Sequence, residues 1–163
     1  MPITSSTRNS PSPLLSHAPQ NNFNQKSLGT YYTCPEITAY LSKRTIHSCI
    51  LHKINAAIIA NDGRDRHFSS LEALLANLDA HLYHELLAIL STISILDPAC
   101  GDGAFLVAAL ETLTGIYESI TSIIASINDP SPAHWLEQAR AEHGNLTYFL
   151  KKKIISENLF GVD

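Results

Sequence analysis

From residue 33 onward, apolar residues recur at a spacing that is typical of amphipathic helices. Between Leu71 and Leu86 a leucine stands at nearly every third or fourth position, which predicts one helix with a buried face. The same spacing between Leu106 and Ile124 predicts a long helix that begins near Ala104. Weaker helical patterns cover residues 34–41, 46–60, 133–142 and 146–156.

Local signals mark where these helices are expected to begin and end. Thr33-x-x-Glu36 and Ser69-x-x-Glu72 both match the capping box, in which a side-chain oxygen caps the first turn. Pro35 suits the first turn of a helix. Asn61-Asp62-Gly63 and the stretch from Asn128 to Pro132 predict breaks.

Two short apolar stretches are predicted to be buried strands. Residues 93–96 are rich in β-branched side chains, and residues 159–162 close the chain just before Asp163. A strand, a turn with glycines and a long helix in that order indicate an α/β fold. The pattern divides the chain into an N-terminal tail (1–26), a helical region (27–92) and the start of the α/β domain (93–163).

Composition narrows the class of protein. Apolar residues make up 45% and charged residues 16%, the formal net charge is −4 and the pI is about 6.0. Such a balance argues against a free-standing nucleic-acid binder, which usually has a basic face. Residues 1–26 are rich in Ser, Pro, Asn and Gln and have no acidic residue, so this tail is predicted to be disordered.

Cysteine and histidine spacing predicts no metal site and no disulfide framework. Cys34, Cys49 and Cys100 are far apart and form no Cys-x-x-Cys pair, which fits a reducing cytoplasm. His81-x-x-His84 lacks the spacing of the zinc signatures, so these side chains are expected to be partly exposed on a helix. No apolar run approaches the roughly 20 residues of a membrane-spanning helix.

The most informative stretch joins the first predicted strand to the long helix. It reads Asp97-Pro98-Ala99-Cys100-Gly101-Asp102-Gly103-Ala104-Phe105. The glycines remove side chains where a ligand approaches the backbone, and a helix start offers free N–H groups. The string resembles the Asp-Pro-x-x-Gly-x-Gly-x-Phe cofactor loop of adenine-N6 DNA methyltransferases, in particular the large fused restriction–modification methylases. It lacks the third glycine of the dinucleotide-binding fingerprint, since Leu106 stands there.

Two further segments match that family in the same order. Gly29-Thr30-Tyr31-Tyr32-Thr33-Cys34-Pro35 resembles the Gly-x-Tyr-Tyr-Thr-x-Pro segment that covers the methionine end of S-adenosylmethionine. Asp163 follows the second predicted strand, where the family has an acidic residue that binds the ribose hydroxyls of the cofactor. The usual spacing of about 20 residues beyond the glycine loop would favour Glu118 instead, but Glu118 lies inside the long periodic helix.

The resemblance implies a partial Rossmann-like methyltransferase fold, with the first two strands, a helical N-terminal arm and a helical insertion over residues 115–157. It implies a cofactor site in which S-adenosylmethionine contacts twelve residues: Gly29, Thr30, Tyr31, Tyr32, Thr33, Asp97, Pro98, Ala99, Gly101, Gly103, Phe105 and Asp163. It also implies methyl transfer to adenine N6 in double-stranded DNA, within restriction–modification or phage defence.

The family's catalytic Asn/Asp-Pro-Pro-Tyr/Phe motif is not found in this sequence, which contains no Pro-Pro dipeptide. We therefore expect no catalytic residue here, no methylation by this polypeptide alone, and DNA contacts through the rest of the methylase. Two alternatives stay open: a methyltransferase that acts on another acceptor, and a non-catalytic remnant or cofactor-binding fragment.

Overall fold

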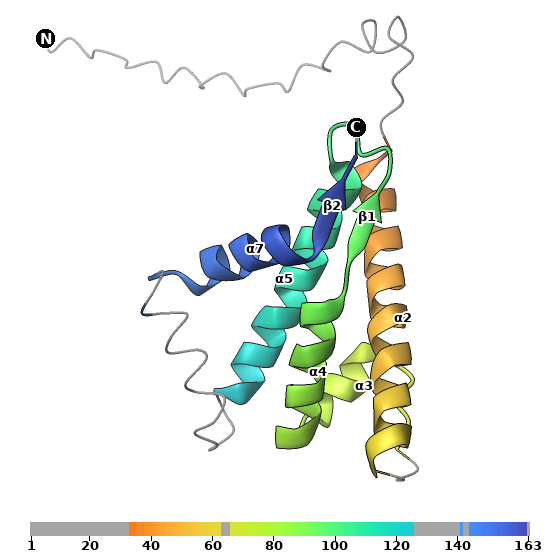
Figure 1. Ribbon diagram of the computed structural model, residues 1–163, viewed down its shortest axis with the longest axis vertical. Helices are drawn as coiled ribbons and strands as arrows, with labels where there is room; N and C mark the ends of the chain where they lie inside the picture. The colour runs from red at the N-terminus through yellow and green to blue at the C-terminus, as the bar shows by residue number, and fades with distance from the viewer. Residues whose placement is uncertain (1–32, 63–65, 126–140, 142–143, 163) are drawn as a thin grey trace, which may run out of the picture. The chain divides into compact units, whose positions relative to one another are not determined.

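The computed structural model describes residues 33–62, 66–125, 141 and 144–162. In chain order their elements are α2 (Pro35–Asp62), α3 (Leu71–Ala76), α4 (Ala80–Thr92), β1 (Ile95–Asp97), α5 (Ala104–Ile124), α7 (Leu146–Glu157) and β2 (Leu159–Gly161). These elements belong to one compact unit that begins at Thr33 (Figure 1). The predicted tail (1–26), segment 29–32, helix 133–142 apart from residue 141, and Asp163 lie outside the described residues.

Helix α2 is a single continuous helix of 28 residues, not the two helices that the sequence pattern predicts. Cys34 occupies the position before the first turn, and its carbonyl oxygen accepts hydrogen bonds from the N–H groups of Ile37 and Thr38. The predicted cap, Thr33, therefore stands one residue too early. The thiol of Cys34 donates to the carboxylate of Glu36, and this bond lowers the pKa of Glu36.

One buried stripe explains why α2 stays continuous across its polar middle. Every fourth side chain is buried, and the stripe changes from hydroxyls to isoleucines along the helix: Thr38, Ser42, Ile46, Ile50, Ile54 and Ile58. Residues four apart differ by about 40° around a helix, so this stripe winds slowly around α2 and keeps one continuous buried edge through the polar middle. The predicted interruption of the helix between residues 41 and 46 is wrong, because polar side chains such as Ser42 and Thr45 occupy helical positions there.

The leucine-rich stretch forms two helices where the periodicity predicts one. After α3 the chain turns at Asn77 and Leu78, and α4 begins at Ala80 with Asp79 as its cap. The Asp79 carboxylate accepts a hydrogen bond of 2.9 Å from the N–H of Leu82. The predicted capping box is also displaced by one residue, because the hydroxyl of Ser70 rather than Ser69 caps α3.

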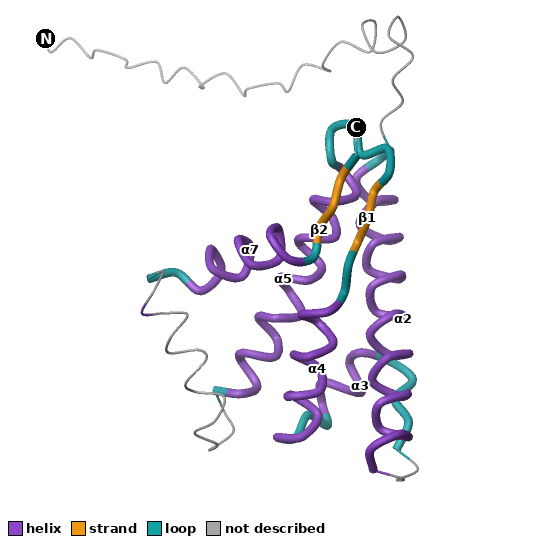
Figure 2. The backbone as a smooth tube through the Cα atoms, in the orientation of Figure 1, coloured by secondary structure: helices purple, strands orange, loops and turns teal. Residues whose placement is uncertain are grey.

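Strands β1 and β2 form a two-stranded parallel sheet. Ile95 pairs with Leu159, Leu96 with Phe160 and Asp97 with Gly161. Each strand is three residues long. Helix α5 packs against both strands, and the two strands end at the same edge as the loop before α5 (Figure 2). The described part of the chain is thus mostly helical with a small parallel sheet, which is compatible with the predicted α/β class.

A buried asparagine fixes the start of this sheet. Asn158 is fully buried, and its side-chain amide donates to the carbonyl oxygens of Leu90 (2.8 Å) and Ile93 (2.7 Å). The main-chain carbonyl oxygen of Asn158 accepts a hydrogen bond of 2.7 Å from the N–H of Ile95. Asn158 therefore ties the end of α4 and the start of β1 to the start of β2.

Candidate functional site: the loop between β1 and α5

The loop between β1 and α5 is a tight turn held by its own backbone and by two aspartates. Gly101 and Gly103 have φ of 50° and 79°, a region that side chains with a Cβ rarely adopt. The N–H of Gly103 donates to the carbonyl of Cys100 at 2.7 Å. The carboxylate of Asp97 accepts a hydrogen bond of 3.2 Å from the N–H of Ala99. The carboxylate of Asp102 likewise accepts one of 3.2 Å from the N–H of Ala104, the first residue of α5. The glycines thus supply the turn that the sequence predicts.

The end of β2 is hydrogen-bonded directly to this loop. The N–H of Val162 donates to the carbonyl of Asp97, and the N–H of Cys100 donates to the carbonyl of Val162, both at 3.0 Å. Gly161 makes the close approach possible. A Cβ at Gly161 would lie 2.9 Å from Cδ1 of Leu106 and 3.1 Å from Sγ of Cys100. The end of the second strand is therefore adjacent to the glycine loop.

The open side of the loop offers backbone donors and space. Among the described residues, no hydrogen-bond acceptor is found for the N–H groups of Phe105 and Leu106, in the first turn of α5. A Cβ built at Gly101 or Gly103 would meet no atom within 4 Å. Free N–H groups at a helix start favour an anionic or polar ligand edge.

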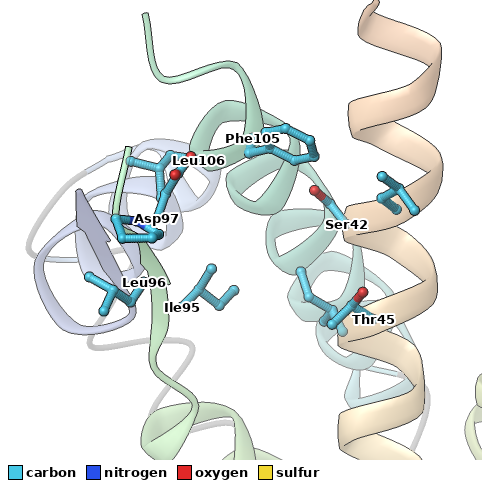
Figure 3. Close-up of a pocket in the computed structure, with 10 residues that line it drawn as sticks. Ser42, Thr45, Ile95, Leu96, Asp97, Phe105 and Leu106 are labelled. Carbon is cyan, nitrogen blue, oxygen red and sulfur yellow. The ribbon is translucent and has the colours of Figure 1, made fainter. Parts of the chain in front are cut away.

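Helix α2 supplies the opposite wall of a pocket beside this loop. The pocket has a volume of about 310 Å³ and is lined by ten residues: Leu41, Ser42, Thr45, Ile46, Ile95, Leu96, Asp97, Pro98, Phe105 and Leu106. Figure 3 shows Ser42 and Thr45 projecting from α2 toward β1 and the start of α5. We call this space the loop pocket. It combines apolar walls with two hydroxyls and one carboxylate, a mixture that is common in small-molecule sites.

The structure brings together part of the predicted set. Asp97, Pro98 and Phe105 line the loop pocket, whereas Ala99, Gly101 and Gly103 belong to the loop itself. Thr33 lies just before α2. Gly29, Thr30, Tyr31, Tyr32 and Asp163 lie outside the described residues. The alternative ribose acid, Glu118, lies in α5 about 20 Å along the helix axis from Ala104, at 1.5 Å per residue.

Sequence reasoning missed the contribution of α2 and the role of Gly161. Ser42 and Thr45 carry no motif, and only their place on α2 brings them to the pocket. Gly161 reads as an ordinary strand residue, although its missing side chain permits the contact with Leu106. Within the described residues, no group of three or more metal-binding side chains exists. His84 instead lies 2.6 Å from the hydroxyl of Tyr83. No helix in the described ranges is long and apolar enough to cross a membrane.

Comparison with known proteins finds a relative that resembles most of this chain. The chain is 34% identical over 145 residues, or 85% of its length, to a protein of Methanocaldococcus jannaschii that bears the name of a type II restriction enzyme and methyltransferase. The chain spans 11% of the length of that relative. No protein-family model matches the chain. No solved structure matches the chain either, and the Rossmann-like part of the predicted fold therefore stays a prediction.

The likeness confirms, at a coarse level, the relation to restriction–modification methyltransferases that the motifs predict. It covers most of this chain and a small part of the relative.

Proposed function

We propose that this chain forms the S-adenosylmethionine-binding part of an adenine-N6 DNA methyltransferase. The observation that carries the proposal is the parallel pairing of β1 with β2. It puts the end of β2 against the glycine loop, where the main chain of Val162 bonds to both Asp97 and Cys100. In open α/β sheets, ligands bind outside the carboxyl ends of the strands.

The loop is suited to such a cofactor. The N–H groups of Phe105 and Leu106 have no acceptor among the described residues and would bind a polar edge of the ligand. The space beside Gly101 and Gly103 lets the ligand approach the backbone. The bound cofactor would supply an electrophilic methyl group on its sulfonium.

The ends of the cofactor are assigned from the resemblance. Asp163, one residue after Val162, would accept both ribose hydroxyls, because one carboxylate has oxygens for two such bonds. Gly29, Thr30, Tyr31, Tyr32 and Thr33 would cover the methionine end. Pro98, Ala99 and Phe105 complete the proposed set.

DNA is proposed as the substrate because the relative is named as a restriction enzyme and methyltransferase. The Asn/Asp-Pro-Pro-Tyr/Phe segment that would hold the target adenine is not among these 163 residues. The complete reaction is therefore proposed for a longer or assembled methylase, in a restriction–modification or phage-defence system, and the present chain contributes the cofactor loop.

Calorimetry with S-adenosylmethionine tests the proposal on the chain itself. We expect the wild-type chain to bind, and Asp163→Ala to weaken binding at least tenfold, since two hydrogen bonds to a charged acceptor would be lost. Gly103→Ala should also weaken binding, because an L residue at φ 79° is strained and the loop must shift.

Glu118→Ala is the matched control. Glu118 accepts a hydrogen bond of 2.8 Å from Thr147 and lies in the body of α5, so this variant should bind the cofactor as the wild type does. A folded wild-type chain that releases no heat with the cofactor would refute the proposal. If Glu118→Ala lost binding while Asp163→Ala kept it, Glu118 would be the ribose acid and the proposed role of Asp163 would be overturned.

A further inference from the structure

Basic side chains gather on the face of α2 that points away from the loop pocket. A second pocket, of about 400 Å³, is lined by Lys43, Arg44 and His47 of α2 and by residues at the start of α3, including Ser69, Ser70 and Glu72. We call it the basic pocket. Positions two apart on a helix are rotated by about 200°. Lys43 and His47 therefore face almost opposite to Leu41 and Thr45, which line the loop pocket.

The two permanent cations of the basic pocket, Lys43 and Arg44, form no ion pair in the part of the chain that the structure describes, although Glu72 and Glu111 lie near Lys43. Both of these basic side chains are exposed. Arg44 is held in place by a hydrogen bond of 3.0 Å from its guanidinium to the hydroxyl of Tyr40, which leaves its other donors available. Glu72 is the only acidic side chain among the lining residues.

Electrostatic coupling indicates that these side chains share one environment. Burial and the positive charge of Lys43 both lower the pKa of His47, and the carboxylate of Glu72 opposes them. His47 and Lys43 in turn contribute to the lowered pKa of Glu72, after its own hydrogen bonds with the backbone and Ser70. Lys43 is a permanent cation close to His47 and Arg44 lines the same pocket, so an anion bound there would be attracted by both cations.

We propose that the basic pocket binds a phosphate group of the DNA backbone. Arginine and lysine are the side chains that most often bind phosphate, and hydroxyls such as those of Ser48 and Ser69 add neutral donors. The choice of DNA as the source of the phosphate rests on the proposed function, whereas the anion chemistry rests on the pocket. Helix α2 would then separate the cofactor on one face from the nucleic acid on the other.

The net charge of the chain makes the proposal specific. With a formal charge of −4, the protein as a whole repels DNA, so binding must come from a local cluster. Lys151 and Lys152 on α7 are a second exposed basic pair and provide the matched comparison. Neither of them forms an ion pair with a described residue, while the neighbouring Lys153 pairs with Glu157 at 2.5 Å.

Fluorescence anisotropy with a labelled DNA duplex of arbitrary sequence, measured on the full chain without S-adenosylmethionine, tests the site. We expect Lys43→Gln with Arg44→Gln to weaken binding at least tenfold at low salt. The slope of log K against log salt should fall by about 1, because the loss of one phosphate contact removes about 0.9. Glu72→Gln should strengthen binding a few-fold, and circular dichroism checks that each variant is folded.

Each outcome bears on the site separately from the cofactor. If the double variant Lys151→Gln with Lys152→Gln weakened DNA binding equally, the loss would reflect the net charge of the protein and the proposed site would be overturned. Failure of the wild type to bind DNA would also overturn it. Displacement of the duplex by low-millimolar inorganic phosphate at matched ionic strength would assign the pocket to a free phosphate and overturn the DNA assignment. Since no cofactor is added, failure here leaves the calorimetric test of the proposed function unaffected.

Discussion

The helical part of the molecule and the strand-and-loop part are stabilised in different ways. In the helices, stability comes from apolar side chains: Ile50, Ile54, Leu74, Leu86 and Leu113 are all fully buried. In the sheet, by contrast, Leu96 and Phe160 are 63% and 47% exposed, although they pair across the two strands. There only Ile95 and Leu159 pack against the core, and the backbone hydrogen bonds and one buried asparagine hold the rest of the chain.

The contrast shows how a ligand loop can be both open and well placed. The helices provide the free energy of folding, and the loop follows from where they put the ends of β1 and β2. Residues of the loop are then free to keep open N–H groups and left-handed glycines, which contribute little to stability. Core substitutions should therefore unfold the protein, whereas substitutions around the sheet should loosen the site first.

The largest effect is expected for a core substitution. Leu113→Ala removes a fully buried side chain from the middle of α5, and should lower the free energy of unfolding by roughly 2–5 kcal/mol in urea denaturation. Val107→Ala is the control on the same helix, because Val107 is 54% exposed, and should change stability by less than about 0.5 kcal/mol. Equal effects would contradict the assignment of helix stability to buried apolar side chains.

An intermediate effect is expected at the junction of the two parts. Asn158→Ala leaves the carbonyls of Leu90 and Ile93 without their buried donor, at a cost of roughly 1–3 kcal/mol. Hydrogen exchange should accelerate at the N–H groups of Ile95, Cys100 and Val162 before it does in α5.

Asn77→Ala is the control for this junction, because Asn77 also donates to a carbonyl, that of Ala73 at 2.8 Å, but is exposed. It should leave exchange in the strands unchanged. Uniform acceleration over all elements in Asn158→Ala would mean that the sheet and the helices open together, contrary to the comparison.

The smallest effect is expected for a helix cap within the helical part. Asp79→Ala should cost about 1 kcal/mol at neutral pH, since it removes the cap of α4. The hydrogen bond from Leu82, with a further contribution from Arg66, lowers the pKa of Asp79 below its usual 3.8. Its stabilisation is therefore present above that value and is lost as the pH falls through the pKa of the folded state.

Urea denaturation between pH 7 and pH 3 measures this dependence. The difference in stability between wild type and Asp79→Ala should shrink toward the acid end of the range. Asp79→Asn keeps an oxygen for the N–H of Leu82 but loses the ion pair with Arg66, which measures 2.9 Å. It should be less destabilising than alanine and show little dependence on pH. A constant difference at every pH would exclude the carboxylate as the source of the effect.

Local patterns predicted the elements around the loop better than those around α2. The start of α5 near Ala104 and both strands followed from short-range signals, because glycines and β-branched residues act within a few positions. The break after α3 was hidden because Leu78 keeps the helical spacing and is buried while the chain turns around it. The caps of Asp79 and Ser70 indicate the true boundaries only once the turn is known.

The walls of the site illustrate what local patterns omit. Asp97 and Phe105 could be assigned to the pocket from a contiguous motif, whereas Ser42 and Thr45 reach it through packing of α2. Likewise the basic pocket joins side chains of α2 with side chains at the start of α3, which are distant in the sequence and share no motif. Contacts between distant segments depend on the tertiary arrangement, which periodicity does not encode.

The bonds of Asn158 reach back 68 and 65 positions along the chain, to Leu90 and Ile93. Closing a loop of that length costs on the order of 4 kcal/mol of chain entropy. On a ribosome, the first strand and its glycines emerge well before the partner that completes their edge. A nascent chain would therefore form α2 to α5 before β2 is made, and would become able to hold a ligand at the loop only once β2 has emerged.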